Sequence, residues 1–298
     1  MPGKPHAAEI HASGFLQLAR ASIALAFFVI TASFCAAEGA VAIPHGTVAL
    51  ISQQRTIQPG HAIRLGLRFQ LEKGWHVYWI NPGDSGEPPR LEWHLPAGLR
   101  AGAIQWPAPN RLPIPPLMDY GYEGEVLLPV SIHISSTLAT GRELTLAAEM
   151  KAIVCHDVCI PAKARLSLLL PVRGERPRES AEAAMFRAAH KDLPWPAPFS
   201  WKPAARDLGD SFELRVNTGH GAPGAWFAPL EPLQIENAAP QKNVTAATGL
   251  RLILKKSDQL LKPLARLRGV LVMPEGAYMI DAPVTSAPVK PIEKGAVR

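Results

Sequence analysis

The sequence predicts an all-β protein, in which an immunoglobulin-like β-sandwich is followed by a short helix and a second, smaller β-domain. Apolar residues make up 47% of the 298 residues and charged residues 19%, so the chain can bury a large core and is not disordered. Its 30 prolines are spread along the chain, which argues against long helices and a helix bundle. Short stretches alternate apolar and polar residues between Gly- and Pro-rich turns, as strands of a sandwich do.

The N-terminus, residues 1–42, is predicted to be a signal peptide. Lys4 and Arg20 precede an apolar run from Ala21 to Phe34, which is shorter than the roughly 20 residues of a membrane span. Ala40-Val41-Ala42 fits a small-x-small cleavage site, and Cys35-Ala36-Ala37 is a second option. We therefore expect an exported protein; lipidation of Cys35 is an alternative.

The immunoglobulin-like domain is predicted over residues 43–173. Its strands alternate in hydrophobicity, and a Pro/Gly loop from Asn81 to Pro89 separates the second from the third. The predicted strands are Ile63–Gln70, Trp75–Trp79, Leu91–Leu95, Val126–Ile134, Leu144–Val154 and Leu166–Leu170.

A linker and a short helix are predicted over residues 174–195, with Ser180 capping an Ala-rich helix that ends near His190. Strand patterns return in the second β-domain, residues 196–288. They cover Phe212–Val216, Leu250–Leu254 and a hairpin of Val270–Met273 with Ala277–Ile280. Residues 289–298 are expected to form a tail.

Chemistry is concentrated at Cys155 and Cys159. They are the two cysteines that remain after the signal peptide, and an even number in an oxidising compartment points to one disulfide. A ring of five residues stabilises a fold by only about 2 kcal/mol, against nearly 5 kcal/mol for a loop of 100 residues. A pair this close is therefore better suited to electron exchange than to stapling the fold.

Neighbouring charges are expected to modulate these cysteines. His156, Lys151 and Lys163 favour a thiolate, whereas Asp157 opposes it. Two other interpretations stay open: an inert structural disulfide, and a copper or zinc site made by Cys155, His156 and Cys159.

Other classes of function find little support. The net charge of +6 is scattered, with no aromatic-interleaved basic stripe, so we expect no nucleic-acid partner. The sequence has no glycine-rich phosphate loop and no Ser/His/Asp arrangement, and we expect neither an organic cofactor nor a metal for thiol chemistry.

Several motifs, in the same order, resemble the N-terminal periplasmic domain of the DsbD/ScsB thiol:disulfide interchange proteins. They are Gly74-Trp75-His76-Val77-Tyr78-Trp79, Asn81-Pro82-Gly83-Asp84-Ser85-Gly86, Gln105-Trp106-Pro107-Ala108-Pro109, Tyr120-Gly121-Tyr122-Glu123-Gly124 and Cys155 to Pro161. The likeness is dense from Gly74 to Pro171 and weaker in the second β-domain, where Tyr278 to Val284 still resembles the family.

The resemblance implies that Cys155 and Cys159 cycle between disulfide and dithiol in the periplasm. It implies that Cys159 forms the mixed disulfide with periplasmic thioredoxin-like partners. A cap loop is expected at Asp119 to Glu123, with Tyr120 or Tyr122 covering the sulfurs. The family's roles include cytochrome c-type biogenesis.

Full-length members of that family continue into membrane spans and a thioredoxin-like domain, which this sequence lacks before Arg298. We therefore expect a separate membrane protein to supply electrons. The expected activity is thiol:disulfide exchange, and whether the chain acts as an enzyme, a protein-disulfide reductase, stays open. The alternative is a non-enzymatic immunoglobulin-like binding module with a structural disulfide, linked to copper tolerance.

Overall fold

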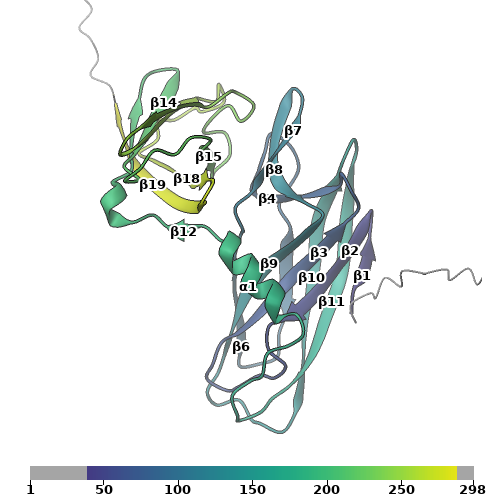
Figure 1. The fold of residues 1–298 in the computed structure, drawn as a ribbon. Coiled ribbons are helices and arrows are strands. Elements are labelled where there is room, and N and C mark those ends of the chain that lie inside the picture. Colours follow the sequence, from purple (N-terminus) through teal and green to yellow (C-terminus); the bar gives the residue numbers. More distant parts are fainter. Residues whose placement is uncertain (1–38, 287–298) are drawn as a thin grey trace, which may run out of the picture. The chain divides into compact units, whose positions relative to one another are not determined.

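The computed structural model describes residues 39–286 (Figure 1). Most of the predicted signal peptide lies outside these residues, including Cys35 and the candidate cleavage site Cys35-Ala36-Ala37. The predicted tail, residues 289–298, also lies outside them. Strands dominate the described part, which contains one short α-helix, so the predicted all-β class is confirmed. Within residues 39–286 no helix is both long enough and apolar enough to cross a bilayer.

Two sheets form the first sandwich. One is ordered β1-β2-β3-β9-β6; the other is ordered β11-β10-β4-β8-β7, with β5 paired to β10. Their bounds are β1 Val41–Ile43, β2 Gly46–Ser52, β3 Ile63–Leu71, β4 His76–Gly83, β5 Arg90–His94, β6 Leu99–Ile104, β7 Asn110–Ile114, β8 Leu117–Glu123, β9 Glu125–Ile134, β10 Glu143–Cys155 and β11 Cys159–Pro171.

The alternation of side chains between the two faces of each strand explains the core between these sheets. In β3, Leu65, Leu67 and Phe69 are fully buried, and they share one apolar cluster with Trp79 and Leu146 of the other sheet. Every second side chain along these strands therefore points inward, and the inward side chains of both sheets meet in one core, as in a sandwich.

The structure extends the predicted strands and adds others. β4 continues to Gly83, inside the predicted loop, because after a register shift it pairs again with Asp119 of β8. β2 was not predicted, because Val48 to Ser52 are all buried and the strand shows no alternation of apolar and polar residues. The predicted boundary after Ala42 falls inside β1, since Ala42 pairs with Thr47 of β2.

Helix α1 spans Ala183–Asp192, so it begins three residues after the predicted cap. Ser180 instead accepts a hydrogen bond from the Glu182 N–H (3.2 Å) and donates one to the Ser52 carbonyl (2.6 Å). Phe186 of α1 packs in a small cluster with Ala49, Ile51, Leu127 and Ala189. This cluster joins the helix to the outer face of β2 and β9.

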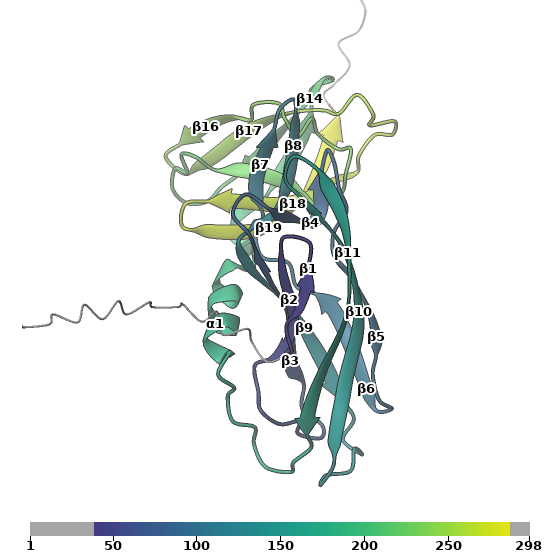
Figure 2. The same cartoon turned by 90° about the vertical axis from the view of Figure 1, so that its right-hand side faces the viewer.

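Residues 195–286 build a second set of strands, which includes β14, β16, β17, β18 and β19 (Figure 2). The strand order is β15-β18-β19-β13-β14-β17-β16, with β12 paired to β19. Their bounds are β12 Trp195–Pro196, the 3-10 helix η1 Phe199–Trp201, β13 Ala204–Asp207, β14 Ser211–Val216, β15 Trp226–Pro229, β16 Lys242–Ala246, β17 Gly249–Lys255, β18 Arg266–Met273 and β19 Gly276–Ser286. A separate apolar cluster, which includes Phe212, Leu252 and Leu271, forms their core.

Candidate functional site

Antiparallel pairing of β10 with β11 brings the two cysteines together. Cys155 lies directly opposite Cys159 at the end of this hairpin, and the two sulfurs form a disulfide of 2.08 Å. The Cα–Cα distance is 4.2 Å, shorter than the 5.5–6 Å expected from disulfides in general, because facing residues of antiparallel strands approach to about 4.5 Å. The His156 N–H donates to the Val158 carbonyl (3.1 Å) and closes the turn.

The two cysteines differ in exposure. Cys155 is fully buried, whereas Cys159 is exposed and follows Val158, whose exposed fraction is 60%. Cys159 is thus the cysteine of the pair that lies at the surface.

A row of residues crosses four strands at the disulfide. Cys155 pairs with Cys159 of β11 and His76 of β4, and His76 pairs with Glu123 of β8. Directly paired residues point to the same face of a sheet, so these four side chains share one face. Tyr78 lies two residues along β4 and shares that face too.

The Tyr78 hydroxyl contacts the exposed cysteine. Its oxygen lies 3.6 Å from the Cys159 Sγ and 3.5 Å from the Ser85 Oγ. Ser85 donates from its hydroxyl and its N–H to the carboxylate of buried Asp119, at 2.5 and 2.9 Å. A polar chain thus runs from a buried carboxylate to the sulfur.

A glycine makes room for this contact. A Cβ on Gly86 would lie 2.1 Å from the Tyr78 Cζ. Gly86 also has a φ of +73°, a backbone conformation that residues other than glycine rarely adopt. The loop that holds Ser85 can therefore lie flat on the Tyr78 ring.

Burial sets the protonation of two site residues. Burial raises the pKa of Tyr78, against a hydrogen bond with Ser85, so its hydroxyl keeps its proton near neutral pH. Burial also lowers the pKa of His76, and the carboxylates of Asp119 and Glu123 offset this only in part. His76 is therefore neutral at pH 7 beside the disulfide.

The turn between the cysteines carries a charged and aromatic cluster. His156 pairs with Asp157 (Nδ1–Oδ2, 2.9 Å), and its ring lies 5.7 Å from that of Trp75. Trp75 in turn stacks on His45 with ring centroids 3.6 Å apart. His156 and Asp157, which are expected to modulate the cysteines, thus form a pair in the turn between them.

The expected cap residues separate into two groups, because they belong to strand β8 and not to a loop. Alternation turns Asp119 and Glu123 toward the disulfide face and Tyr120 and Tyr122 toward the core. The Tyr120 ring packs edge-on against Trp79, and the Tyr122 hydroxyl donates to the Pro107 carbonyl (2.7 Å). The tyrosine beside the sulfur is Tyr78, which corrects the expectation for Tyr120 or Tyr122.

The structure also bears on the metal alternative. Within residues 39–286 no three His, Cys, Asp or Glu side chains are grouped so that they hold a metal ion. Here the sulfurs bond each other and His156 pairs with Asp157.

Sequence reasoning missed Tyr78, Ser85 and His76 as site residues. A signal was present: a strand with Val77 and Trp79 on its core face carries His76 and Tyr78 on the other, where plain polar residues are usual. Large amphipathic side chains on the outer face of a strand indicate that something covers that face.

Part of the chain is similar to known proteins. Residues 47–171 match the family model "Thiol:disulfide interchange protein DsbD, N-terminal". The chain is similar to the N-terminal periplasmic domain of ScsB from Proteus mirabilis, with 17% identity, a TM-score of 0.62, and coverage of 84% of this chain and 98% of that one. The periplasmic chaperone SfaE has 11% identity, with coverage of 80% and 100%, but its TM-score of 0.20 supports no argument. No curated protein matches the chain.

Proposed function

We propose that the Cys155–Cys159 pair passes electrons to thioredoxin-like proteins of the periplasm, because residues 47–171 match the model of the DsbD N-terminal family. The observation that carries the proposal is the difference in exposure, because Cys159 is exposed and Cys155 is buried. A separate membrane protein is the proposed electron donor.

The chemistry needs only the two cysteines and the partner's disulfide. In the dithiol form, the Cys159 thiolate attacks one partner sulfur, and the partner's other sulfur leaves as a thiolate and takes up a proton. The Cys155 thiol then loses its proton, and the thiolate attacks the Cys159 sulfur and releases the partner as a dithiol. Two electrons pass to the partner, and the disulfide seen here is the oxidised product.

Trapping tests the order of attack. We expect a Cys155→Ser variant to form a stable mixed disulfide with an oxidised periplasmic thioredoxin-like protein, because Cys159 can attack and nothing can resolve the product. The matched Cys159→Ser variant should give little adduct, since Cys155 is buried. Adduct formation by Cys159→Ser alone would reverse the assignment.

The alternative of a binding module with an inert disulfide, linked to copper tolerance, makes a different prediction. A structural disulfide has a reduction potential below about −300 mV and does not exchange with thioredoxin-like proteins. Equilibration of the wild-type protein with glutathione buffers measures that potential. A value in the glutathione range together with exchange supports the redox function.

Export is part of the proposal. Val41 and Ala42 pair with β2, so cleavage after Ala42 would remove two of the three residues of β1. We therefore expect cleavage upstream, at the site that follows Ala37. N-terminal sequencing of the mature periplasmic protein checks this, and a mature chain that begins at Ile43 would contradict it.

A further inference from the structure

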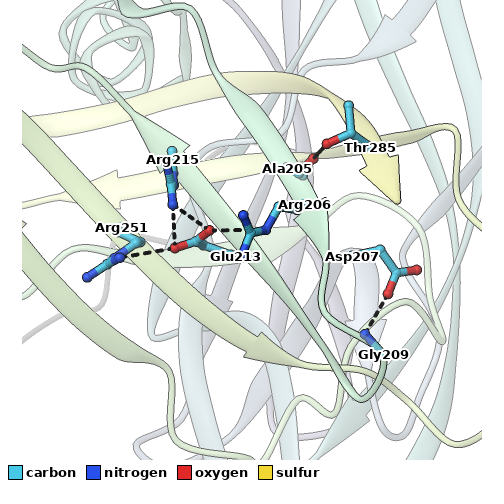
Figure 3. Close-up of polar contacts among 8 residues, drawn as sticks. All are labelled: Ala205, Arg206, Asp207, Gly209, Glu213, Arg215, Arg251 and Thr285. Atoms are coloured by element: carbon cyan, nitrogen blue, oxygen red, sulfur yellow. Dashed lines mark hydrogen bonds and ion pairs between the residues drawn. The ribbon is translucent and has the colours of Figure 1, made fainter. Parts of the chain in front are cut away.

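The second set of strands carries a basic face. Its centre is Glu213 of β14, which is approached by Arg206 of β13, Arg215 of β14 and Arg251 of β17 (Figure 3). The Glu213 carboxylate lies 2.9 Å from the Arg215 guanidinium and 3.2 Å from that of Arg251. The Arg206 guanidinium lies 3.9 Å from the same carboxylate. We call this group, with Lys242 and Lys255, the basic face.

The strand register places these charges on one side of the sheet. Arg215 lies directly opposite Arg251, and Glu213 lies opposite both Arg206 and Ile253. Lys242 of β16 pairs with Ile253, and Lys255 pairs with Ser211. Phe212, Leu214 and Leu252 alternate with these residues and face the core, so the basic face is the outer one.

The charges on this face do not balance. Two arginines directly across from each other repel, and such a pair costs stability unless a carboxylate lies between them. Glu213, with 5% of its side chain exposed, supplies one negative charge against three guanidinium groups. Burial alone would raise the pKa of Glu213, but the hydrogen bonds and charges of the arginines outweigh it and hold the pKa below its ordinary value.

The arginines keep unused donors. Each guanidinium carries five N–H groups, and a carboxylate accepts about four hydrogen bonds in all. The three side chains are each about half exposed, at 52%, 58% and 45%. Positioned donors that face solvent with net positive charge are what a further anionic group binds.

From this geometry we propose that the basic face binds an extended acidic segment of a protein partner. Neighbouring strands lie about 4.8 Å apart, so the charges spread over roughly 10 Å from β13 to β17, more than one small anion can span. In an extended peptide, side chains on one side repeat about every 7 Å, which suits successive carboxylates. The basic face carries no aromatic side chain among its described residues, so it lacks the stacking platform of single-stranded nucleic-acid sites.

The probe is a labelled peptide of alternating Glu and Ser, titrated with the full mature chain and followed by fluorescence anisotropy. We expect binding that weakens steeply with salt, and no binding of the matching Lys–Ser peptide. The double variant Arg215→Gln/Arg251→Gln should weaken binding about tenfold or more. The double variant Arg176→Gln/Arg178→Gln removes the same net charge from exposed residues elsewhere, and it should change binding less than about twofold.

A variant that should strengthen binding keeps the test decisive if Arg215→Gln/Arg251→Gln folds poorly. Glu213→Gln removes the one neutralising charge, so it should tighten peptide binding while it destabilises the fold. Equal weakening by both double variants would overturn the proposal. So would displacement of the peptide by millimolar inorganic phosphate, or a preference for a single-stranded oligonucleotide. None of these measurements involves the cysteines, so the outcome is independent of the proposed redox function.

Discussion

At the scale of single residues, Tyr78 links the disulfide to the rest of the site. Its hydroxyl stands 3.6 Å from the Cys159 Sγ, and burial raises its pKa so that it remains a donor. A hydroxyl that donates to a sulfur stabilises the thiolate more than the thiol, because hydrogen bonds to charged groups are the stronger ones. Tyr78 is therefore expected to promote attack by Cys159.

Replacement of Tyr78 by Phe removes that donor. Because a hydrogen bond to a charged group contributes about 1.5–3 kcal/mol, we expect alkylation of reduced Cys159 at pH 7 to slow about tenfold. The matched control is Tyr120→Phe, since the Tyr120 hydroxyl is buried on the other face of its strand. Stopped-flow alkylation of both variants in the Cys155→Ser background measures the effect, and equal rates for the two would refute the role of Tyr78.

Gly86 supports Tyr78 through its lack of a side chain. An Ala at this position pays about 1–2 kcal/mol for the left-handed backbone and about 1–3 kcal/mol more for the overlap with the Tyr78 ring. Gly124→Ala is the control, because Gly124 also has a positive φ (+66°) but its Cβ would meet nothing within 4 Å. Urea unfolding should rank Gly86→Ala below Gly124→Ala in stability, and the reverse order would contradict the packing seen here.

At the scale of elements, strand register decides which residues can act together. The pairing of β10 with β11 and β4 puts the cysteines, His76 and Glu123 in one row. A slip of one residue would turn each side chain to the opposite face. The same rule keeps Tyr120 and Tyr122 in the core, away from the sulfurs.

Helix α1 is held by its apolar side, where Phe186 is the largest of the buried side chains. Phe186→Ala should lower the free energy of unfolding by about 3–5 kcal/mol, because a buried aromatic ring leaves a cavity. Phe199→Ala is the matched control: this side chain is 96% exposed, so its loss should change stability by less than about 0.5 kcal/mol. Denaturant titration compares the two, and a small effect of Phe186→Ala would mean that α1 contributes little to the fold.

At the scale of the whole molecule, buried ionisable groups make stability depend on pH. Burial opposes ionisation of Glu213, but its arginines lower its folded pKa below the ordinary 4.5. As the pH falls, this carboxylate takes up a proton in the unfolded chain at a higher pH than in the folded protein. The stabilisation is therefore present at neutral pH and is lost as the pH falls through the folded pKa. The hydrogen bond from Lys256 lowers the pKa of Asp207 and acts in the same direction.

We therefore expect the free energy of unfolding to fall as the pH drops below about 5, and the fall to be smaller in Glu213→Gln. Glu175→Gln, at an exposed position of the segment before α1, should leave the pH dependence of the wild type unchanged. Urea titrations at a series of pH values give the comparison. Parallel acid transitions for the wild type and Glu213→Gln would exclude Glu213 as a source.

The sequence by itself determined the β class, the strands with clear alternation and the importance of Cys155 and Cys159, because periodicity and residue type are local properties. Through motifs that occur in order, it also showed that the first domain resembles the DsbD N-terminal family, whose model matches residues 47–171. Only the tertiary structure decided that Cys159 is exposed and Cys155 buried, that Tyr78 takes the place expected of Tyr120 or Tyr122, and that three arginines gather around Glu213. Each of these depends on which strands pair and in which register, and that is decided by burial of side chains far apart in the chain.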